Sequence, residues 1–405
     1  MKPKRKGKDN LKVIKVLAFF DTAQTGVPVA GTKIYDIPLT GNTLKASQPM
    51  EVLQILGQRE GAKPSFGNLK SSGAIDSPVT GDLAPLVFTA VMGAPVSTVD
   101  FTTDVWAAAT LYAVGDVVNH SNGLHSLVCQ VAGTSGATEP DLSAYPTAFD
   151  GRGLEVTDDT AIWAIAPKKL KYTFKTGSCL PPLTIEIERG DGCAGGAKQY
   201  EKYIGLRFGQ LPITFAGGDI TMLKTSFPVE GSQVDGTLKN PSYASISTIA
   251  GVEIINLLSN TYSKDQSVAT IDGVTTTALK LTDFGVTVNN NLSSADLIGG
   301  NAAYVSIGAL DVKGNMSGFL ANGDVLALEQ QLANHSSLRC EFTLGNKSSG
   351  DSIKIILPET TGSYPTVTDS LTEDSKFSAE ISSSKGGTEN TTVYAEVVSS
   401  IPYSI

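Results

Sequence analysis

Short apolar runs separated by glycine are the feature that most limits how this chain can fold. The 405 residues include 41 glycines, and Ser, Thr and Asn are abundant between the apolar runs. In segment 183–188, Leu183, Ile185 and Ile187 alternate with polar residues. Successive side chains of a strand point to opposite faces, so this alternation predicts a strand with one buried face and one face in water. Repeated along the chain, the pattern predicts a mainly β protein built of antiparallel sheets.

Further strands and one helix are expected. Asp324 can act as the N-cap of a helix. Val325, Leu328 and Leu332 fall on one face of that helix, and this face should lie against a sheet. Alternating segments predict other strands at 171–175, 203–208, 220–226, 303–310, 352–357 and 392–398.

The sequence pattern leaves two questions open. Segment 50–56 fits either a helix or a strand. The stretches 208–231 and 286–318 share a rhythm of strand and glycine-containing turn, which indicates a faint internal duplication at most.

The two tryptophans of the chain, Trp106 and Trp163, bracket a segment that resembles a small module placed inside a larger β-rich protein. A loop tolerates such an insertion because the entropy of closing it grows only slowly with its length. We therefore expect a body formed by 1–103 and 168–405, and a small inserted β module at 104–167. The body is long enough to bury a core of its own.

Charge and hydropathy limit the partners and the location. The net charge is −9 at pH 7, and the sequence pI is near 5.0. Because phosphate contacts dominate affinity for nucleic acid, this acidic chain is a poor candidate for gripping DNA. The apolar run 16–20 is too short for an export signal or a membrane span, so we expect no membrane partner and assembly in the cytoplasm. A basic cluster precedes this run and is interpreted as a solvated tail: Lys2, Lys4, Arg5, Lys6 and Lys8.

No motif for catalysis, cofactor binding or metal binding is supported by the sequence around it. Segment 190–195 matches G-x-G-x-x-G, but 203–208 reads as a strand where a dinucleotide site needs a helix, so a hairpin connection is expected. Segment 189–191 spells Arg-Gly-Asp, which recurs by chance. The cysteines show no metal or disulfide spacing and are expected to be free thiols, and the histidines are too few for a base and metal ligands: Cys129, Cys179, Cys193, Cys340, His120, His125 and His335.

Three aromatic residues in the module leave two interpretations open. Flat rings such as Trp106, Tyr112 and Trp163 can stack on sugar faces and so bind carbohydrate. In a module of about 60 residues, the same rings can instead form the hydrophobic core.

The body resembles the tail tube proteins of long-tailed bacteriophages. The resemblance rests on the apolar strand and Gly/Pro turn at 17–28, on 170–186, and on the strand at 203–208. It implies an antiparallel β-sandwich or half-barrel with a flanking helix, and a structural protein of the virion rather than an enzyme. In this family six copies close into a ring and rings stack into a tube, through which DNA passes without specific binding.

The resemblance also implies contacts with itself and with tape measure and tail terminator proteins, and assembly in the host bacterial cytoplasm. Six copies would carry a charge on the order of −50, which repels DNA phosphates from the bore. The inserted module resembles small modules with Y-x-x-G-D-x-V and a closing Trp, found in phage structural proteins and chitin-binding domains, and would project outward. The alternative function is a glycan-binding surface or adhesion protein that acts through 104–167.

Overall fold

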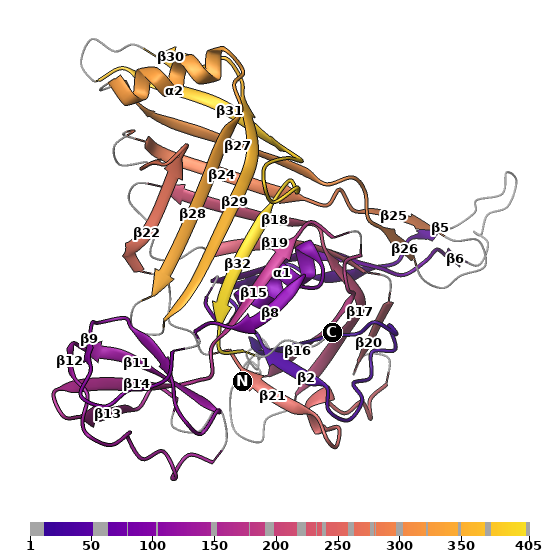
Figure 1. The fold of residues 1–405 in the computed structure, drawn as a ribbon. Coiled ribbons are helices and arrows are strands. Elements are labelled where there is room, and N and C mark those ends of the chain that lie inside the picture. The colour runs from indigo at the N-terminus through magenta and orange to yellow at the C-terminus, as the bar shows by residue number, and fades with distance from the viewer. Residues whose placement is uncertain are drawn as a thin grey trace, which may run out of the picture.

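The computed structural model describes most of the chain, and Figure 1 shows its fold. The residues outside the description are 1–11, 52–63, 79, 103, 147–151, 178, 191–197, 217–223, 232, 237–239, 258–262, 276–278, 280, 297–302, 321–322, 347–349, 369–373 and 402–405.

Two large sheets form the body, which confirms the predicted mainly β fold. The first has ten strands, of which only β2 and β21 are parallel neighbours among the described pairings. Its path is β21 (Glu253–Asn256), β2 (Lys33–Asp36), β1 (Lys12–Phe20), β16 (Leu183–Gly190), β17 (Gln199–Phe208), β19 (Lys224–Gly231), β7 (Lys70–Pro78) and β3 (Gly41–Asn42), with β20 (Gln233–Gly236) on β17 and β4 (Lys45–Ser47) on β7.

The second sheet has twelve strands and rises as the tall curved sheet in Figure 1. Its path is β18 (Gln210–Ala216), β24 (Leu281–Asn289), β27 (Asp311–Phe319), β31 (Lys376–Ser384), β29 (Asp351–Gly362), β28 (Leu338–Asn346), β22 (Ser263–Ile271) and β23 (Val274–Thr275), while β15 (Leu170–Lys175) pairs with β32 (Tyr394–Ser399) and β8 (Ser97–Asp100), β32 also pairs with β29, and β30 (Thr366–Thr368) pairs with β31.

Smaller pairs complete the fold. Two arms, each a short antiparallel pair, leave the body: β5 (Met50–Glu51) with β6 (Ser65–Phe66), and β25 (Ser293–Asp296) with β26 (Ala303–Ser306). A 3₁₀ turn spans Ile246–Thr248. Residues 104–167 hold a four-stranded sheet, β10 (Val117–Asn119), β11 (His125–Val131), β14 (Ala161–Pro167) and β13 (Glu155–Asp158), and a pair formed by β9 (Leu111–Tyr112) and β12 (Gly133–Thr134).

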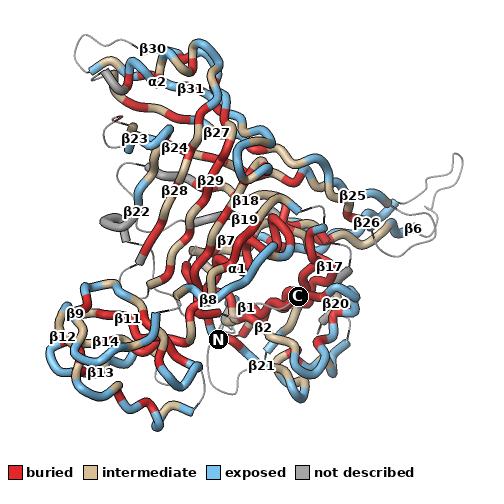
Figure 2. Tube along the Cα trace, viewed as in Figure 1, coloured by how far each residue is buried: buried red, intermediate tan, exposed pale blue. Residues whose placement is uncertain are grey.

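A buried helix, α1 (Ala84–Met92), lies between the two large sheets. It contacts β17 of the first sheet and β15 and β32 of the second, and all nine of its residues are buried. The sequence interpretation missed it because a helix that is apolar all round shows no amphipathic period. The buried segments gather around it in Figure 2, so α1 occupies the centre of the main core.

The second helix, α2 (Gly323–Ala333), was expected and is confirmed. Val325, Leu328 and Leu332 are buried, and the helix contacts β29. The predicted cap at Asp324 is wrong, because the helix already begins at Gly323 and Asp324 lies within its first turn.

The predicted strands are largely confirmed. Segments 171–175, 203–208 and 352–357 lie within β15, β17 and β29, and 392–398 overlaps β32. The strand expected at 303–310 ends at Ser306. Of the segments expected at 220–226 and 50–56, the described residues 224–226 belong to β19 and Met50–Glu51 to β5. The remaining residues of these two segments lie outside the described residues.

The prediction of a wet face on 183–188 is wrong. Thr184, Glu186 and Glu188 are buried, like the apolar residues between them. The reason is tertiary: β16 is a central strand between β1 and β17, and the segment around residues 243–249 covers its second face. The Glu186 carboxylate there accepts hydrogen bonds from Tyr243 Oη (2.6 Å), Ser245 Oγ (2.5 Å) and the Ile246 amide (3.0 Å).

Replacing Glu186 by Ala is expected to lower the free energy of unfolding by about 3–4 kcal/mol, because three buried donors lose their acceptor. Urea unfolding followed by circular dichroism measures the change. Glu253→Ala, at an exposed position of β21, is the matched control and should stay within about 0.5 kcal/mol of the parent. Equal effects of the two substitutions would contradict the role given to Glu186.

Candidate functional site

One face of the 12-stranded sheet is mostly polar. On β24, β27 and β31 the apolar residues point to the core, and the alternate residues stand on the opposite, more exposed face. Cross-strand register places Thr287, Lys313, Ser382 and Thr361 in one row over four strands. We call this surface the polar sheet face. It comprises Asp283, Thr287, Asn289, Asp311, Lys313, Asn315, Ser317, Ser378, Glu380, Ser382, Thr361, Lys354, Arg339, Glu341, Glu396 and Lys171.

Carboxylates neutralise cations on the polar sheet face. Lys171 Nζ lies 3.0 Å from Glu396 Oε1, and Lys313 Nζ lies 2.8 Å from Asp311 Oδ2. Lys354 pairs with Glu341 (3.2 Å), and Arg339 bridges Glu341 and Glu389. Hydrogen bonds from Arg339 lower the pKa of Glu389 to about 2. At neutral pH these pairs leave the face with a mixed, internally compensated charge.

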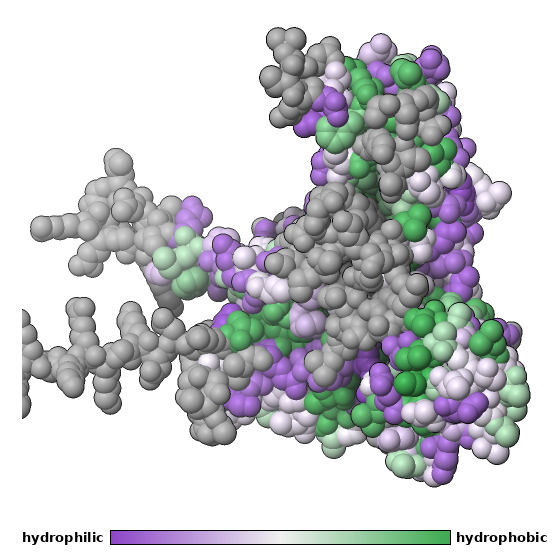
Figure 3. Space-filling view, turned by 90° about the vertical axis from the view of Figure 1, so that its left-hand side faces the viewer, coloured by the Kyte–Doolittle hydropathy of each residue, from purple (hydrophilic) through white to green (hydrophobic). Residues whose placement is uncertain are grey.

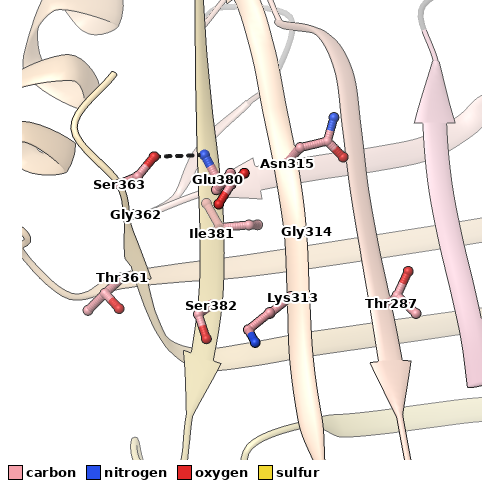
Figure 4. Close-up of a pocket in the computed structure, with 10 residues that line it drawn as sticks. All are labelled: Thr287, Lys313, Gly314, Asn315, Thr361, Gly362, Ser363, Glu380, Ile381 and Ser382. Atoms are coloured by element: carbon pink, nitrogen blue, oxygen red, sulfur yellow. Dashed lines mark hydrogen bonds between the residues drawn. The ribbon is translucent and has the colours of Figure 1, made fainter. Parts of the chain in front are cut away.

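A shallow hollow of about 590 Å³ lies on this face, lined from β24, β27, β29 and β31 (Figure 4). Its polar lining consists of hydroxyls, one amide, Lys313 and Glu380. The Glu380 amide donates to Ser363 Oγ at 2.9 Å. The described residues that line the hollow include neither histidine nor cysteine, and they offer hydrogen-bond donors and acceptors.

Trp106, Tyr112 and Trp163 lie together, and both indoles bind one carboxylate. Trp106 Nε1 and Trp163 Nε1 both donate to Asp158 Oδ2, at 2.7 and 3.0 Å, and the Gly136 amide donates to Asp158 Oδ1 at 2.8 Å. The Tyr112 and Trp163 rings meet edge to face, with centroids 4.8 Å apart. The Tyr112 hydroxyl accepts from the Ala107 amide at 3.0 Å.

Burial of these rings favours the core interpretation. Trp163 is fully buried, Tyr112 is 8% exposed, and Trp106 is half-buried against the same cluster, which is separate from the main core. A buried ring cannot stack on a sugar without opening the core. Tyr112 also borders an open cleft of about 800 Å³, together with Phe101, Val105 and Asp116. The carbohydrate-binding role of the three residues stays a prediction.

Residues 104–167 leave and rejoin the body between neighbouring strands. β8 and β15 pair antiparallel, with Asp100 opposite Leu170. On the return side, the Lys169 amide donates to Ser126 Oγ. Ser126 and Val128 on the second face of the small sheet are fully buried, and Val117 and Val128 lie against the turn at Gly350. The small sheet is therefore covered on both faces.

Four charged residues meet at this junction. Arg152 of the inserted segment pairs with Asp82 at the start of α1, and Lys169 pairs with Asp351 of β29. Asp82, Lys169 and Asp351 are each at most 5% exposed. Burial raises the pKa of Asp82 to about 6, against the opposing effect of Arg152, and the nearby Asp351 adds to the rise. Because the four residues are far apart in the sequence, no local pattern could have indicated the cluster.

The remaining sequence expectations concern isolated residues. The Ser-, Asn- and Gly-rich stretch around His120 and His125 predicts that both side chains are exposed, and this prediction is wrong. Both are buried, with His120 Nε2 2.8 Å from the Pro140 carbonyl. Cys129, Cys179 and Cys340 are free, and Cys193 lies outside the described residues. β16 and β17 pair on either side of 191–197, which confirms a hairpin connection there.

Among the described residues, neither a metal-ligand cluster nor a membrane-spanning helix occurs. No group of three or more His, Cys, Asp or Glu in that part of the chain could hold a metal ion. Neither of its helices has the length and apolar character that crossing a bilayer requires.

Comparison with known proteins gives the class. The family model of phage tail tube proteins matches residues 16–393, nearly the whole chain including the inserted segment. The chain therefore belongs to the phage tail tube protein family, a family of structural virion proteins. A comparison with curated proteins found no match.

Replacing Asp158 by Ala is expected to loosen the small aromatic core, because a buried indole N–H, a half-buried indole N–H and one amide lose their acceptor, at a cost of about 2–4 kcal/mol. Both tryptophans of the chain lie there, so tryptophan fluorescence reports on this core alone. The emission should shift to the red in Asp158→Ala and stay unchanged in the exposed control Asp159→Asn. An unshifted emission in Asp158→Ala would argue against the carboxylate as the organising group.

Replacing Asp82 by Asn is expected to change how stability depends on pH. The folded protein holds a proton on Asp82 between about pH 4 and pH 6 that the unfolded chain has lost, so this group stabilises the fold below about pH 4. That contribution is lost as the pH rises through 6. Asn has no proton to lose. The free energy of unfolding of the variant should therefore fall by about 2–3 kcal/mol less than that of the parent between about pH 4 and pH 6.

Urea unfolding at a series of pH values from 4 to 7 measures the difference between Asp82→Asn and the parent. The exposed Asp104→Asn serves as the control and should run parallel to the parent curve. If Asp82→Asn also ran parallel to the parent, the raised pKa would be refuted.

Proposed function

We propose that this protein polymerises into stacked rings that form the tube of a phage tail, and that the tube is the conduit for DNA during ejection. Membership of the tail tube family is the observation that carries the proposal. The proposal includes six structural units around each ring, contacts with tape measure and tail terminator proteins, and assembly in the host bacterial cytoplasm. It assigns the protein no catalytic activity.

The ends of the two sheets support self-assembly. Among the described strands, β18 is hydrogen-bonded on one side only, to β24, and β21 closes the path of the 10-stranded sheet. A strand edge carries a row of backbone donors and acceptors that another copy can pair with. Sheet pairing between neighbouring copies therefore provides the ring contacts in this proposal.

The polar sheet face is our candidate for the surface of the bore. Its hydroxyl and amide groups stay hydrated, and Lys171, Lys313 and Lys354 already have carboxylate partners. DNA phosphates would then meet few uncompensated cations, and the chain as a whole is at −9. Since affinity for DNA follows the number of phosphates that cations neutralise, such a bore lets DNA slide.

We propose that residues 104–167 form a separate module on the outside of the tube, inserted in a body of 1–103 and 168–405. Its own core around Trp163 and its attachment between β8 and β15 support this division. The face of the molecule that carries it mixes hydrophobic and hydrophilic residues (Figure 3), as solvent-facing protein surfaces do.

Negative-stain electron microscopy of the purified chain at high concentration tests the proposal, and tubes or stacked rings are expected. A variant with 104–167 replaced by a short Gly/Ser link should form tubes of the same bore without the outer density. Because the deletion removes Arg152 and opens the cluster around Asp82, the same deletion with Asp82→Asn is the matched control. A full-length chain that stays monomeric at every concentration and salt condition would contradict the function.

A further inference from the structure

Two stretches of the chain carry the same succession of elements. The first runs through β3 and β4, the arm β5–β6, β7, α1 and the pair β8–β15. The second runs through β24, the arm β25–β26, β27, α2 and the pair β28–β29. In both, a strand leads to a projecting arm, a returning strand, a helix and an antiparallel pair. We call the first stretch, 41–175, repeat one and the second, 281–362, repeat two.

The strand pairing of the two repeats agrees. The strands on either side of the arm pair antiparallel, β4 with β7 in repeat one and β24 with β27 in repeat two. The returning strand then has an antiparallel neighbour on its other side, β19 for β7 and β31 for β27. In each case that neighbour comes after the repeat in the sequence. The repeats therefore share the pairing around the arm. They differ after the helix, because the strand pair β8–β15 lies in the other large sheet from β7, whereas β28 and β29 lie in the same sheet as β27.

The helices agree too. Four residues separate the helix from the next strand in both repeats, 93–96 after α1 and 334–337 after α2. Each helix contacts the second strand of the pair that follows it, α1 on β15 and α2 on β29. In repeat two the contact is close, because a Cβ added at Gly362 would lie 2.1 Å from Leu332 Cδ2.

The repeats differ where the inserted segment sits. It occupies the connection between β8 and β15, whereas the corresponding connection between β28 and β29 is only residues 347–350. Gly350 of that short connection packs against Val117 and Val128 of the insertion. The insertion is thus present in repeat one only, and it packs against Gly350 in the corresponding connection of repeat two.

The direction of the arms indicates how the repeats are related. In Figure 1 both arms leave the body toward the same side. A rotation about the axis of a ring keeps equivalent elements on the same side of the ring, whereas a two-fold axis in the plane of the ring would send them to opposite sides. The two repeats also share one sheet, because β15 of repeat one pairs with β32, which pairs with β29 of repeat two.

We propose that each chain supplies two of the structural units around a ring, so that a ring of six units is built from three copies of the chain. The inference rests on the proposed function and changes only the number of chains per ring. The partner is a second copy of this chain, and the sheet that joins the repeats within one chain is the counterpart of the sheet contact between chains.

Cryo-electron microscopy of the tubes, with mass measurement of single rings, tests this inference. Three chains of 42.3 kDa give 3 × 42.3 = 126.9 kDa per ring, and six give 6 × 42.3 = 253.8 kDa. We expect the lower mass, three-fold symmetry, six similar spokes and three outer protrusions per ring. The deletion of 104–167 should remove the three protrusions and leave the six spokes, which identifies the protrusions as the insertion.

Different outcomes would contradict the two-unit inference and the proposed tube function. Rings of six chains with six protrusions would overturn the two-unit inference and leave the tube intact. Rings of any other number of chains would overturn it as well. A chain that forms no rings or tubes under any condition would overturn the proposed function itself.

Discussion

Burial of one apolar face of the 12-stranded sheet against α1 and the 10-stranded sheet is the interaction on which the rest of the structure depends. Phe174 and Phe284 of the 12-stranded sheet and Ile185 of the 10-stranded sheet belong to the same cluster as the wholly buried helix, so the two sheets share one core. Apolar area removed from water contributes roughly 25 cal/mol per Å², and a core of this size can hold long strands without disulfides. Because the core takes one face of the sheet, the other face is left to water.

That division links the core to the proposed function. The same alternation that places Val286 and Ile381 inside places Thr287 and Ser382 outside, so a broad polar sheet face is a consequence of packing. The strand edges then carry the contacts between copies in the proposed ring. The insertion lies outside the two large sheets. Val117 and Val128 pack against Gly350 at the junction, and Arg152 pairs there with Asp82.

Local pattern was enough for part of this architecture. The period of two indicated β15, β17 and β29, and the helical period indicated α2, because each of these segments shows one apolar face in its own residues. The failures have different physical reasons. Helix α1 is apolar all round and has no period to read, and Glu186 is buried by a segment some 60 residues away. Trp106 and Trp163 were singled out from the sequence, but Asp158, which organises them, was not.

The sequence by itself determined the mainly β class and the family, because alternation, turn residues and family motifs are local properties of the chain. The boundaries of the inserted segment stay a prediction. Only the tertiary structure decided which polar residues are buried, how Asp82, Arg152, Lys169 and Asp351 meet, and that two distant stretches repeat one arrangement. Such relations depend on long-range pairing of strands, and a pairing partner leaves no mark on the residues of a single strand.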